Sequence, residues 1–236
     1  MLTHSELLQE LKKSPDLALL IKEANSILSE NNEKRVVFYN SIKEFDKVEY
    51  INGEAIFHSP VRLKHSLISS NLSYLLLHHL KTTKLGGRIC IEKVMIELTR
   101  NSYEPDICYF RKEVADTFTD NQMLFPTPDF IVEILSPSTE KIDREIKFRD
   151  YAQHDVKEYW IIDPDKETVE QYELKEKQFE LLVKVNSGTV VSKTIEGFSR
   201  VKKYFCLTCR HTHPTKLLNT SKFHSTFLSQ APTPLR

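Results

Sequence analysis

Two carboxylates lie inside apolar segments where ionised groups are rare. Asp106 opens the run Ile-Cys-Tyr-Phe, and Glu133 lies within Phe-Ile-Val-Glu-Ile-Leu. Burying an unpaired charge in a strand is costly, so two such intrusions on neighbouring predicted strands suggest one shared cause. A divalent cation bound between the two side chains would be such a cause. Because both candidate ligands are carboxylate oxygens, magnesium, manganese or calcium is favoured over zinc.

Each carboxylate also has a simpler interpretation. Asp106 follows Pro105, which is typical of a turn or cap residue. Glu133 could instead form a buried pair with a lysine or an arginine. The two interpretations, metal ligand and structural residue, stay open at this point.

A third candidate lies on the helix predicted from Lys141 to His154. Asp143, Lys147 and Tyr151 recur every four residues there, so they share one face of that helix. If the helix packs across the strand of Glu133, the ammonium group of Lys147 would reach the site. The alternative, which the spacing alone favours, is an ordinary surface ion pair between Asp143 and Lys147.

Apolar runs that alternate with amphipathic helices predict an α/β fold with a mixed sheet. Asn52-Gly53 is a strong turn signal and predicts a hairpin over residues 47–58. Leucine spacing predicts a helix over residues 65–81, and residues 1–30 are expected to be helical with a break at residues 14–16. Four strands are expected, at residues 89–98, 106–110, 130–135 and 158–163.

The overall composition excludes some classes of protein. Lys+Arg and Asp+Glu both number 33 in 236 residues, which argues against a bulk polyanion binder but leaves room for a local basic groove. The first residues, MLTHSELLQELKK, lack the apolar stretch of a signal peptide. No apolar run approaches the length of a membrane span. A cytoplasmic protein with no membrane contact is therefore expected.

Several motifs follow one another in a defined order: PDI at residues 105–107, VEILSPST at 132–139, D-x-x-x-K-x-x-x-Y on the predicted helix at 143–151 and EYWIIDP at 158–164. Their order and spacing resemble the Uma2 family, also called DUF820, within the PD-(D/E)XK nuclease superfamily. An Asn-Gly-Glu hairpin turn, Ser59-Pro60 and His65 at the head of a helix also fit. The resemblance covers about residues 45–198. It implies a restriction-endonuclease-like α/β core, a mixed sheet flanked by helices.

The resemblance also implies a site and a chemistry. Asp106 and Glu133 would hold Mg²⁺ or Mn²⁺, and Lys147 would replace the lysine that such nucleases usually carry two residues after the acidic one, where this chain has Leu135. The cation would polarise a phosphodiester of nucleic acid, with DNA the expected substrate, and lower the pKa of a bound water. Lys147 would orient that water or stabilise the developing charge.

Two further residues match recurrent family positions with less defined roles. Glu54 could complete the metal site or cap the hairpin turn after Gly53. His65 could contact a phosphate, although a histidine there is more often a helix-start residue.

The expected organisation has three parts: a helical extension over residues 1–34, a nuclease-like domain over 35–198, and a flexible basic tail over 199–236. The tail contains no Asp or Glu. It does contain Cys206, Cys209, His211 and His213, which could bind zinc, but a disordered tail is the simpler reading because one short segment rarely surrounds the metal.

Three functions remain open from the sequence. The first is a metal-dependent endonuclease. The second is a nucleic-acid-binding module of the same fold that has lost catalysis, suggested by Leu135 at the usual lysine position. The third is a dimeric scaffold, a homodimer whose interface is the helical segment 1–30.

Overall fold

The computed structural model describes residues 4–43 and 46–201. Their helices are α1 (His4–Lys13), α2 (Leu17–Ser41), α3 (Leu63–Thr83), α4 (Lys112–Ala115), the π-helical segment η1 (Ile142–Lys147) and α5 (Phe148–Gln153). The possible zinc ligands between residues 206 and 213 lie outside the described part of the chain.

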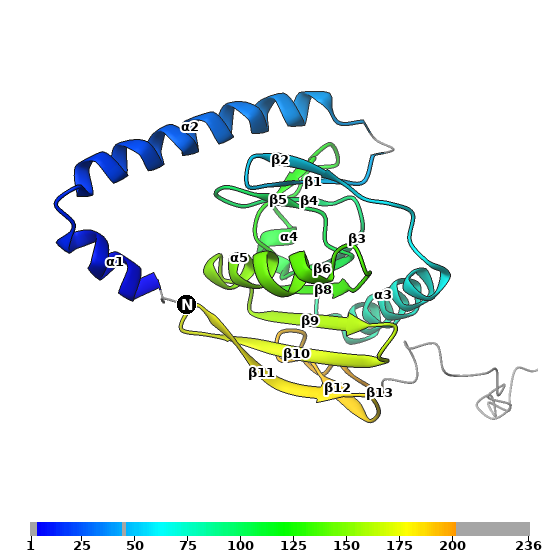
Figure 1. The fold of residues 1–236 in the computed structure, drawn as a ribbon. Coiled ribbons are helices and arrows are strands. Elements are labelled where there is room, and N and C mark those ends of the chain that lie inside the picture. Colours follow the sequence, from blue (N-terminus) through cyan, green and yellow to red (C-terminus); the bar gives the residue numbers. More distant parts are fainter. Residues whose placement is uncertain (1–3, 44–45, 202–236) are drawn as a thin grey trace, which may run out of the picture.

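Two sheets form the body of the molecule (Figure 1). The larger has six strands in the order β11-β10-β9-β8-β6-β3. Its strands are β3 (Arg88–Ile91), β6 (Ile107–Phe110), β8 (Phe130–Ile134), β9 (Glu158–Asp163), β10 (Thr168–Lys175) and β11 (Gln178–Val185). Only β8 and β9 run parallel to each other, so the sheet is mixed, as expected.

The smaller sheet has the order β2-β1-β5-β4-β7. Its strands are β1 (Val48–Ile51), β2 (Glu54–Phe57), β4 (Met95–Glu97), β5 (Ser102–Tyr103) and β7 (Leu124–Phe125). A further pair, β12 (Thr189–Val191) and β13 (Ser199–Val201), is antiparallel. The hairpin predicted around Asn52-Gly53 is confirmed as β1 and β2, and the predicted helix 65–81 as α3.

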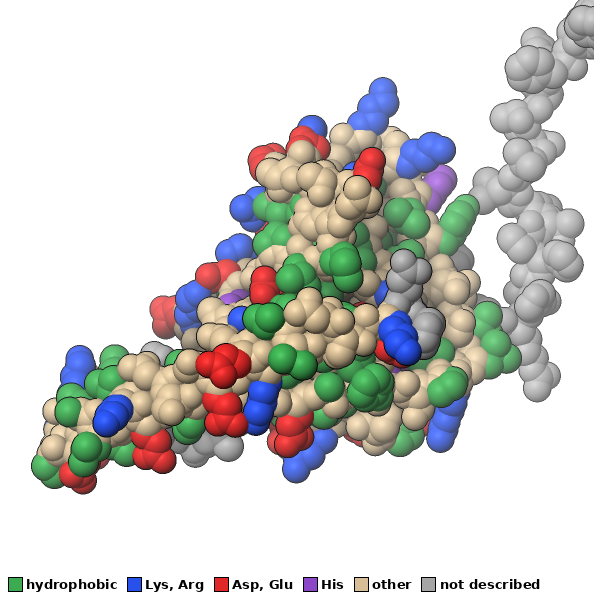
Figure 2. Space-filling model, turned by 90° about the horizontal axis from the view of Figure 1, so that it is seen from above, with side chains coloured by type: hydrophobic (Ala, Val, Ile, Leu, Met, Phe, Trp, Pro, Cys, Tyr) green, Lys and Arg blue, Asp and Glu red, His purple; other side chains and the backbone are tan. Residues whose placement is uncertain are grey.

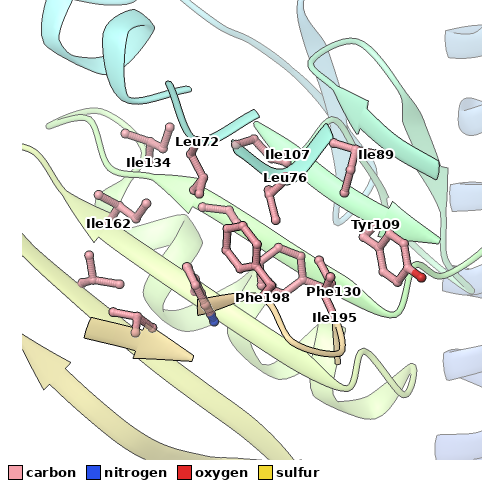
Figure 3. Packing of buried hydrophobic residues seen from close by; sticks show 14 of the residues in the cluster. Leu72, Leu76, Ile89, Ile107, Tyr109, Phe130, Ile134, Ile162, Ile195 and Phe198 are labelled. Atoms are coloured by element: carbon pink, nitrogen blue, oxygen red, sulfur yellow. The ribbon is translucent and has the colours of Figure 1, made fainter. Parts of the chain in front are cut away.

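The central strand β8 is covered on both faces, which explains why every residue of it except Glu133 is apolar. Successive side chains of a strand point to opposite faces. One set packs beneath α3, where Figure 3 shows Leu72 and Leu76 against Ile134 and Phe130. The other face of β8 meets α5 and the smaller sheet, in a cluster that includes Ile131, Tyr151 and Tyr103. Glu133 belongs to this second face by its position in the alternation.

The strand expected over residues 89–98 is instead two strands in different sheets. β3 ends at Ile91 and β4 begins at Met95. Between them Glu92 and Lys93 both have positive φ, 45° and 49°, which turns the chain from one sheet to the other. Their residue types do not predict this change of sheet, because neither is a glycine or an asparagine.

The N-terminal helices divide into an exposed part and a packed part. The break at residues 14–16 is as expected, but α2 runs on to Ser41, past residue 34 where we expected the extension to end. Phe38 is 5% exposed and its ring lies 5.2 Å from that of Tyr50. Tyr39 Oη is 2.5 Å from Ser102 Oγ, so the last turns of α2 are part of the core of the smaller sheet.

The earlier part of the helical segment is exposed. Figure 2 looks onto this side of the molecule, where hydrophobic and charged side chains are interspersed. Large apolar residues at its surface include Leu19, Leu20, Ile21, Ile27 and Leu28. None of the described helices is both long enough and apolar enough to cross a membrane. At the other end of the described chain, residues 199–201 form β13, so the domain continues slightly past the expected limit at 198.

The different packing of the two parts of α2 gives a matched pair of substitutions. Phe38→Ala should lower the free energy of unfolding by about 3–5 kcal/mol, because it empties a buried aromatic site. Ile27→Ala, at a position that is 47% exposed, should change it by about 0.5 kcal/mol or less. Urea denaturation measures both. A large loss with Ile27→Ala, rising with protein concentration, would contradict this and indicate that a second copy covers the helix.

An ion pair between half-buried Arg144 and buried Glu170 fixes η1 against the sheet. Arg144 donates to both carboxylate oxygens of Glu170 on β10, at 2.7 and 3.1 Å. Burial alone would raise the pKa of Glu170, but hydrogen bonds from Arg144, Tyr172 and Lys184 outweigh it and lower that pKa to about 2. The helix that carries Lys147 is thereby held to the sheet at its first turn.

Glu170→Gln should therefore destabilise the protein in a pH-dependent way. A carboxylate whose pKa is lowered by folding stabilises the fold above its unfolded value near 4.5, and this contribution is lost as the pH falls toward 2. We expect a loss of about 1–3 kcal/mol at pH 7 that shrinks below pH 4. Melting temperatures between pH 3 and 8 measure it. The control is Glu180→Gln, which removes an exposed pair with Lys175 and should show almost no effect.

Candidate functional site

A pocket of about 250 Å³ opens beside the carboxyl end of β8. The hairpin, the segment that leads into α3, the loop after β8 and η1 all contribute to its walls. Its lining residues with acidic or basic side chains are Lys47, His58, Arg62, Lys64, His65, Glu104, Asp106, Glu133, Asp143, Lys147 and Asp165. The residues predicted from sequence thus meet in one pocket, with the exception of Glu54.

Asp106 is held at this pocket by three different elements. Its Oδ2 accepts a hydrogen bond from the Ile134 backbone N–H at 2.8 Å and lies 3.1 Å from His65 Nε2. Its Oδ1 lies 3.1 Å from Lys47 Nζ. Burial opposes the charge, but His65, Lys47 and the Ile134 amide hold the pKa of Asp106 well below its usual range. Asp106 is therefore an ionised carboxylate immediately beside β8.

Glu133 lies on the same side of the larger sheet as η1 and α5. Its Oε1 accepts hydrogen bonds from Lys147 Nζ at 3.0 Å and from Tyr151 Oη at 2.9 Å. Burial raises the pKa of Glu133 well above its ordinary value; Lys147 opposes this, while Asp143, Asp106 and Glu49 add to it. Lys147 is thus buried against Glu133, one member of the predicted acidic pair, rather than pointing to solvent.

The ammonium group of Lys147 lies between three carboxylates. It is 2.8 Å from Glu49 Oε1, 3.0 Å from Glu133 Oε1 and 3.1 Å from Asp143 Oδ1. Burial opposes its charge, but Asp143, Glu133 and Glu49 together raise the pKa of Lys147 well above its ordinary value. The alternative of a surface ion pair between Asp143 and Lys147 is wrong, because the pair exists but both side chains are buried.

Glu49 is a site residue that the sequence reasoning missed. It lies on β1 with no exposed surface, and its Oε1 also accepts a hydrogen bond from the Glu104 backbone N–H at 2.9 Å. His58 Nε2 lies 3.1 Å from its other oxygen. Burial raises the pKa of Glu49, but Lys147 and His58 outweigh this and hold it below the ordinary value. The signal was available, because Glu49 also interrupts an apolar strand.

Glu54, the accessory residue expected from the hairpin, lies elsewhere. It is the first residue of β2, is exposed and does not line the pocket. The hairpin does supply an acidic residue to the site, but from β1 rather than from the turn. His65, the second accessory candidate, is buried and contacts Asp106, so its position fits a role in holding that carboxylate.

Glu104 adds a further carboxyl group to the pocket. It is buried, and its Oε2 accepts a hydrogen bond from the Val48 backbone N–H at 3.1 Å. Burial, with a smaller contribution from Glu49 and against the Val48 hydrogen bond, raises the pKa of Glu104 to about 7. The pocket thus contains both a firmly ionised carboxylate, Asp106, and a carboxyl group that is partly protonated at neutral pH.

The donor set fits a hard divalent cation. Three carboxyl groups lie within 2.8 to 3.1 Å of the one ammonium group of Lys147. Asp143 Oδ1 is also buried without a well-directed hydrogen bond. In the described part of the chain, no three His, Cys, Asp or Glu side chains already surround one metal position. Magnesium commonly uses only one or two carboxylates and keeps several waters, so Asp106 and Glu133 suffice in number and type.

The architecture, a mixed sheet between helices with an acidic pocket at the end of its central strand, is that of a restriction-endonuclease-like α/β protein. The chain belongs to the Uma2 family: the family model described as "Putative restriction endonuclease" matches residues 38–201. The matched range begins within the packed end of α2, so the exposed helical segment lies outside it.

Relatives of similar sequence come from a cyanobacterium. The chain is 33% identical over 125 residues to the "Uncharacterized protein slr1290" of Synechocystis, and the match spans 51% of this chain and 62% of that protein. It is 30% identical over 130 residues to "Uncharacterized protein sll1609" of the same organism, spanning 54% of this chain and 72% of the relative. The chain therefore covers less than two thirds of the first of these proteins.

A solved structure has a similar fold. It is described as "a putative nuclease belonging to DUF820 from Anabaena variabilis" and superposes with a TM-score of 0.61. The superposition covers 71% of this chain and 94% of that one, at 23% sequence identity. This likeness supports the fold assignment.

Replacing Lys147 tests the charge arrangement of the site. Lys147→Met should lower the free energy of unfolding by about 3–5 kcal/mol at pH 8, because it leaves buried carboxylates without their cation. The loss should be smaller at pH 5, because a lower pH favours protonation of the buried carboxyl groups and so reduces the negative charge that Lys147 offsets. Urea denaturation at both pH values measures it.

The matched control is Lys141→Met, at an exposed position just before η1. It should leave stability almost unchanged at both pH values. If Lys147→Met were as stable as the wild type at pH 8, the buried carboxyl groups would not depend on the ammonium group of Lys147, which would contradict this arrangement of charges.

Proposed function

We propose that this protein is a metal-dependent endonuclease that hydrolyses phosphodiester bonds in DNA. The observation that carries the proposal is the convergence of Asp106, Glu133 and Lys147 in one pocket, with the Lys147 ammonium group 3.0 Å from Glu133. Membership of a family of nuclease-like proteins supports the reaction class. The metal, the preference for DNA and the activity itself are part of the proposal.

Asp106 and Glu133 would hold Mg²⁺ or Mn²⁺. The bound cation would supply a Lewis acid and a water of lowered pKa, the two contributions on which such hydrolyses depend. Ionised Asp106 suits this role because His65 and Lys47 fix its carboxylate and keep it charged. Tyr151 orients Glu133 through its hydroxyl group.

Lys147 would act on the phosphate. Its pKa lies well above the ordinary value, so it stays protonated at neutral pH and cannot serve as a general base. A fixed positive charge in a buried site stabilises the negative charge that develops on the phosphoryl oxygens. Asp143, four residues earlier on η1, and Glu49 on β1 hold the ammonium group in place.

A plasmid nicking assay tests the proposal. We expect cleavage with Mg²⁺ or Mn²⁺ that EDTA abolishes, and a loss of about 100-fold or more with Asp106→Asn, Glu133→Gln or Lys147→Ala. Glu54→Gln is the control, since this exposed carboxylate lies outside the pocket and its loss should leave the rate unchanged. Circular dichroism confirms that each variant is folded.

The same assay separates the proposal from its alternatives. Wild-type protein that binds DNA but never cleaves it, with either metal, would indicate a binding module of the same fold. Cleavage that persists in Asp106→Asn would exclude the site described here. Isothermal titration of Mn²⁺ into the wild type and Glu133→Gln gives a reading that does not depend on turnover, and binding should weaken in the variant.

A further inference from the structure

The mouth of the pocket carries a second set of charges, distinct from the acidic interior. Arg62 precedes α3 as its N-cap residue, and Lys64 lies in the first turn. Both line the pocket, together with Asp165 from the turn between β9 and β10. Arg62 Nη1 lies 3.9 Å from Asp165, and the Lys64 ammonium group contacts the same carboxylate.

These three residues span two sides of the pocket mouth. The segment from β2 to α3 supplies the two cations, and the turn after β9 supplies the acid. His65, the next residue after Lys64, contacts Asp106 at 3.1 Å. The first turn of α3 therefore connects Asp106 in the interior to the rim of the pocket, which Arg62, Lys64 and Asp165 form. This connection holds the two cations at a fixed position relative to the acidic site.

The charges at the mouth do not cancel. Arg62 and Lys64 bring two positive charges, and Asp165 supplies one negative charge, which leaves one positive charge in excess. Arg62 is 65% exposed by its side chain and Lys64 30%, so a ligand from solution can reach both. One phosphodiester carries the single negative charge that would complete the balance.

A polyanion needs such a rim to approach this site. Inside the pocket, four carboxyl groups (Glu104, Asp106, Glu133 and Asp143) lie with two lysines (Lys47 and Lys147), and the chain as a whole has no net charge. Each lysine is already in contact with a carboxyl group, Lys47 with Asp106 and Lys147 with Glu133. Neither the interior nor the net charge therefore supplies long-range attraction for a nucleic-acid backbone, which leaves that attraction to exposed cations such as Arg62 and Lys64.

We propose that Arg62 and Lys64 bind a backbone phosphate of the nucleic acid next to the one at the acidic site, and that Asp165 competes with that phosphate for them. The two cations are substrate-positioning residues. Asp165 keeps them aligned in the free protein and limits non-specific binding. The proposal rests on the proposed function for the identity of the ligand, but its binding step does not require cleavage.

The test is equilibrium binding of a short fluorescein-labelled DNA duplex to the full chain, followed by fluorescence anisotropy in EDTA so that nothing is cleaved. Arg62→Ala combined with Lys64→Ala should weaken binding about tenfold or more. It should also reduce the slope of log K against log salt by about one, since one phosphate contact is lost. Asp165→Asn should tighten binding several-fold.

A matched control removes two other exposed cations. Lys81→Ala combined with Arg88→Ala changes the net charge equally but alters no residue that lines the pocket. It should weaken binding much less than the rim variant. Equal losses in the two double variants, or unchanged or weaker binding with Asp165→Asn, would overturn the proposal.

Failure of this proposal and failure of the proposed function give different results. If wild-type protein binds DNA through Arg62 and Lys64 but does not cleave it with metal, the rim proposal holds and the hydrolytic function fails. If the protein cleaves DNA and the rim variant binds and cleaves like the control, the function holds and the rim proposal fails.

Discussion

The contact on which the rest of the structure depends is the Lys147 ammonium group between Glu49, Glu133 and Asp143. Its three partners come from β1, β8 and η1, so one buried charge connects the smaller sheet, the larger sheet and the helix between them. A buried lysine without partners would lose its proton, or the fold would open to expose it. Three buried carboxylates without a lysine would destabilise the fold still more. The core therefore tolerates these groups only together, which explains why they lie at the junction of all three elements.

The two faces of β8 differ in polarity, which explains how such a polar cluster can lie in an apolar domain. Along this strand the residues that face α3 are all apolar, and Figure 3 shows Phe130 and Ile134 packed with Leu72 and Leu76. Glu133 points to the other face, where Tyr151 and Lys147 satisfy its carboxylate. Because successive residues alternate between faces, one polar residue can be inserted without breaking the core under α3. The strand is thus a rigid support for a charged site on one side only.

Much of this site could be predicted from sequence, because carboxylates inside apolar strands are exceptional. Asp106 and Glu133 were recognisable in this way, and the four-residue spacing placed Lys147 on one face with Asp143 and Tyr151. The spacing could not tell a surface pair from a buried one, since that depends on where η1 packs. The Asn52-Gly53 turn is also recognisable in the sequence, but as a candidate site residue it points to Glu54 rather than to Glu49. Which acidic residue of a short hairpin is buried is decided by the sheet that covers it, not by the turn.

Other features of the fold could not be predicted from local sequence patterns, because they too depend on tertiary packing. The end of α2 carries adjacent apolar residues whose partner, Tyr50, lies on a strand that follows later in the chain. The change of sheet at Glu92 and Lys93 uses residue types that give no turn signal. The rim of the pocket shows the same dependence on tertiary structure, because Asp165 meets Arg62 and Lys64 only after β9 has been placed beside β8. A chain with no net charge can still present a cationic mouth above an acidic interior, since folding separates charges that composition averages. For this reason the arrangement of the loops sets the electrostatics of the proposed binding, whereas the strands beneath them position the residues proposed for the chemistry.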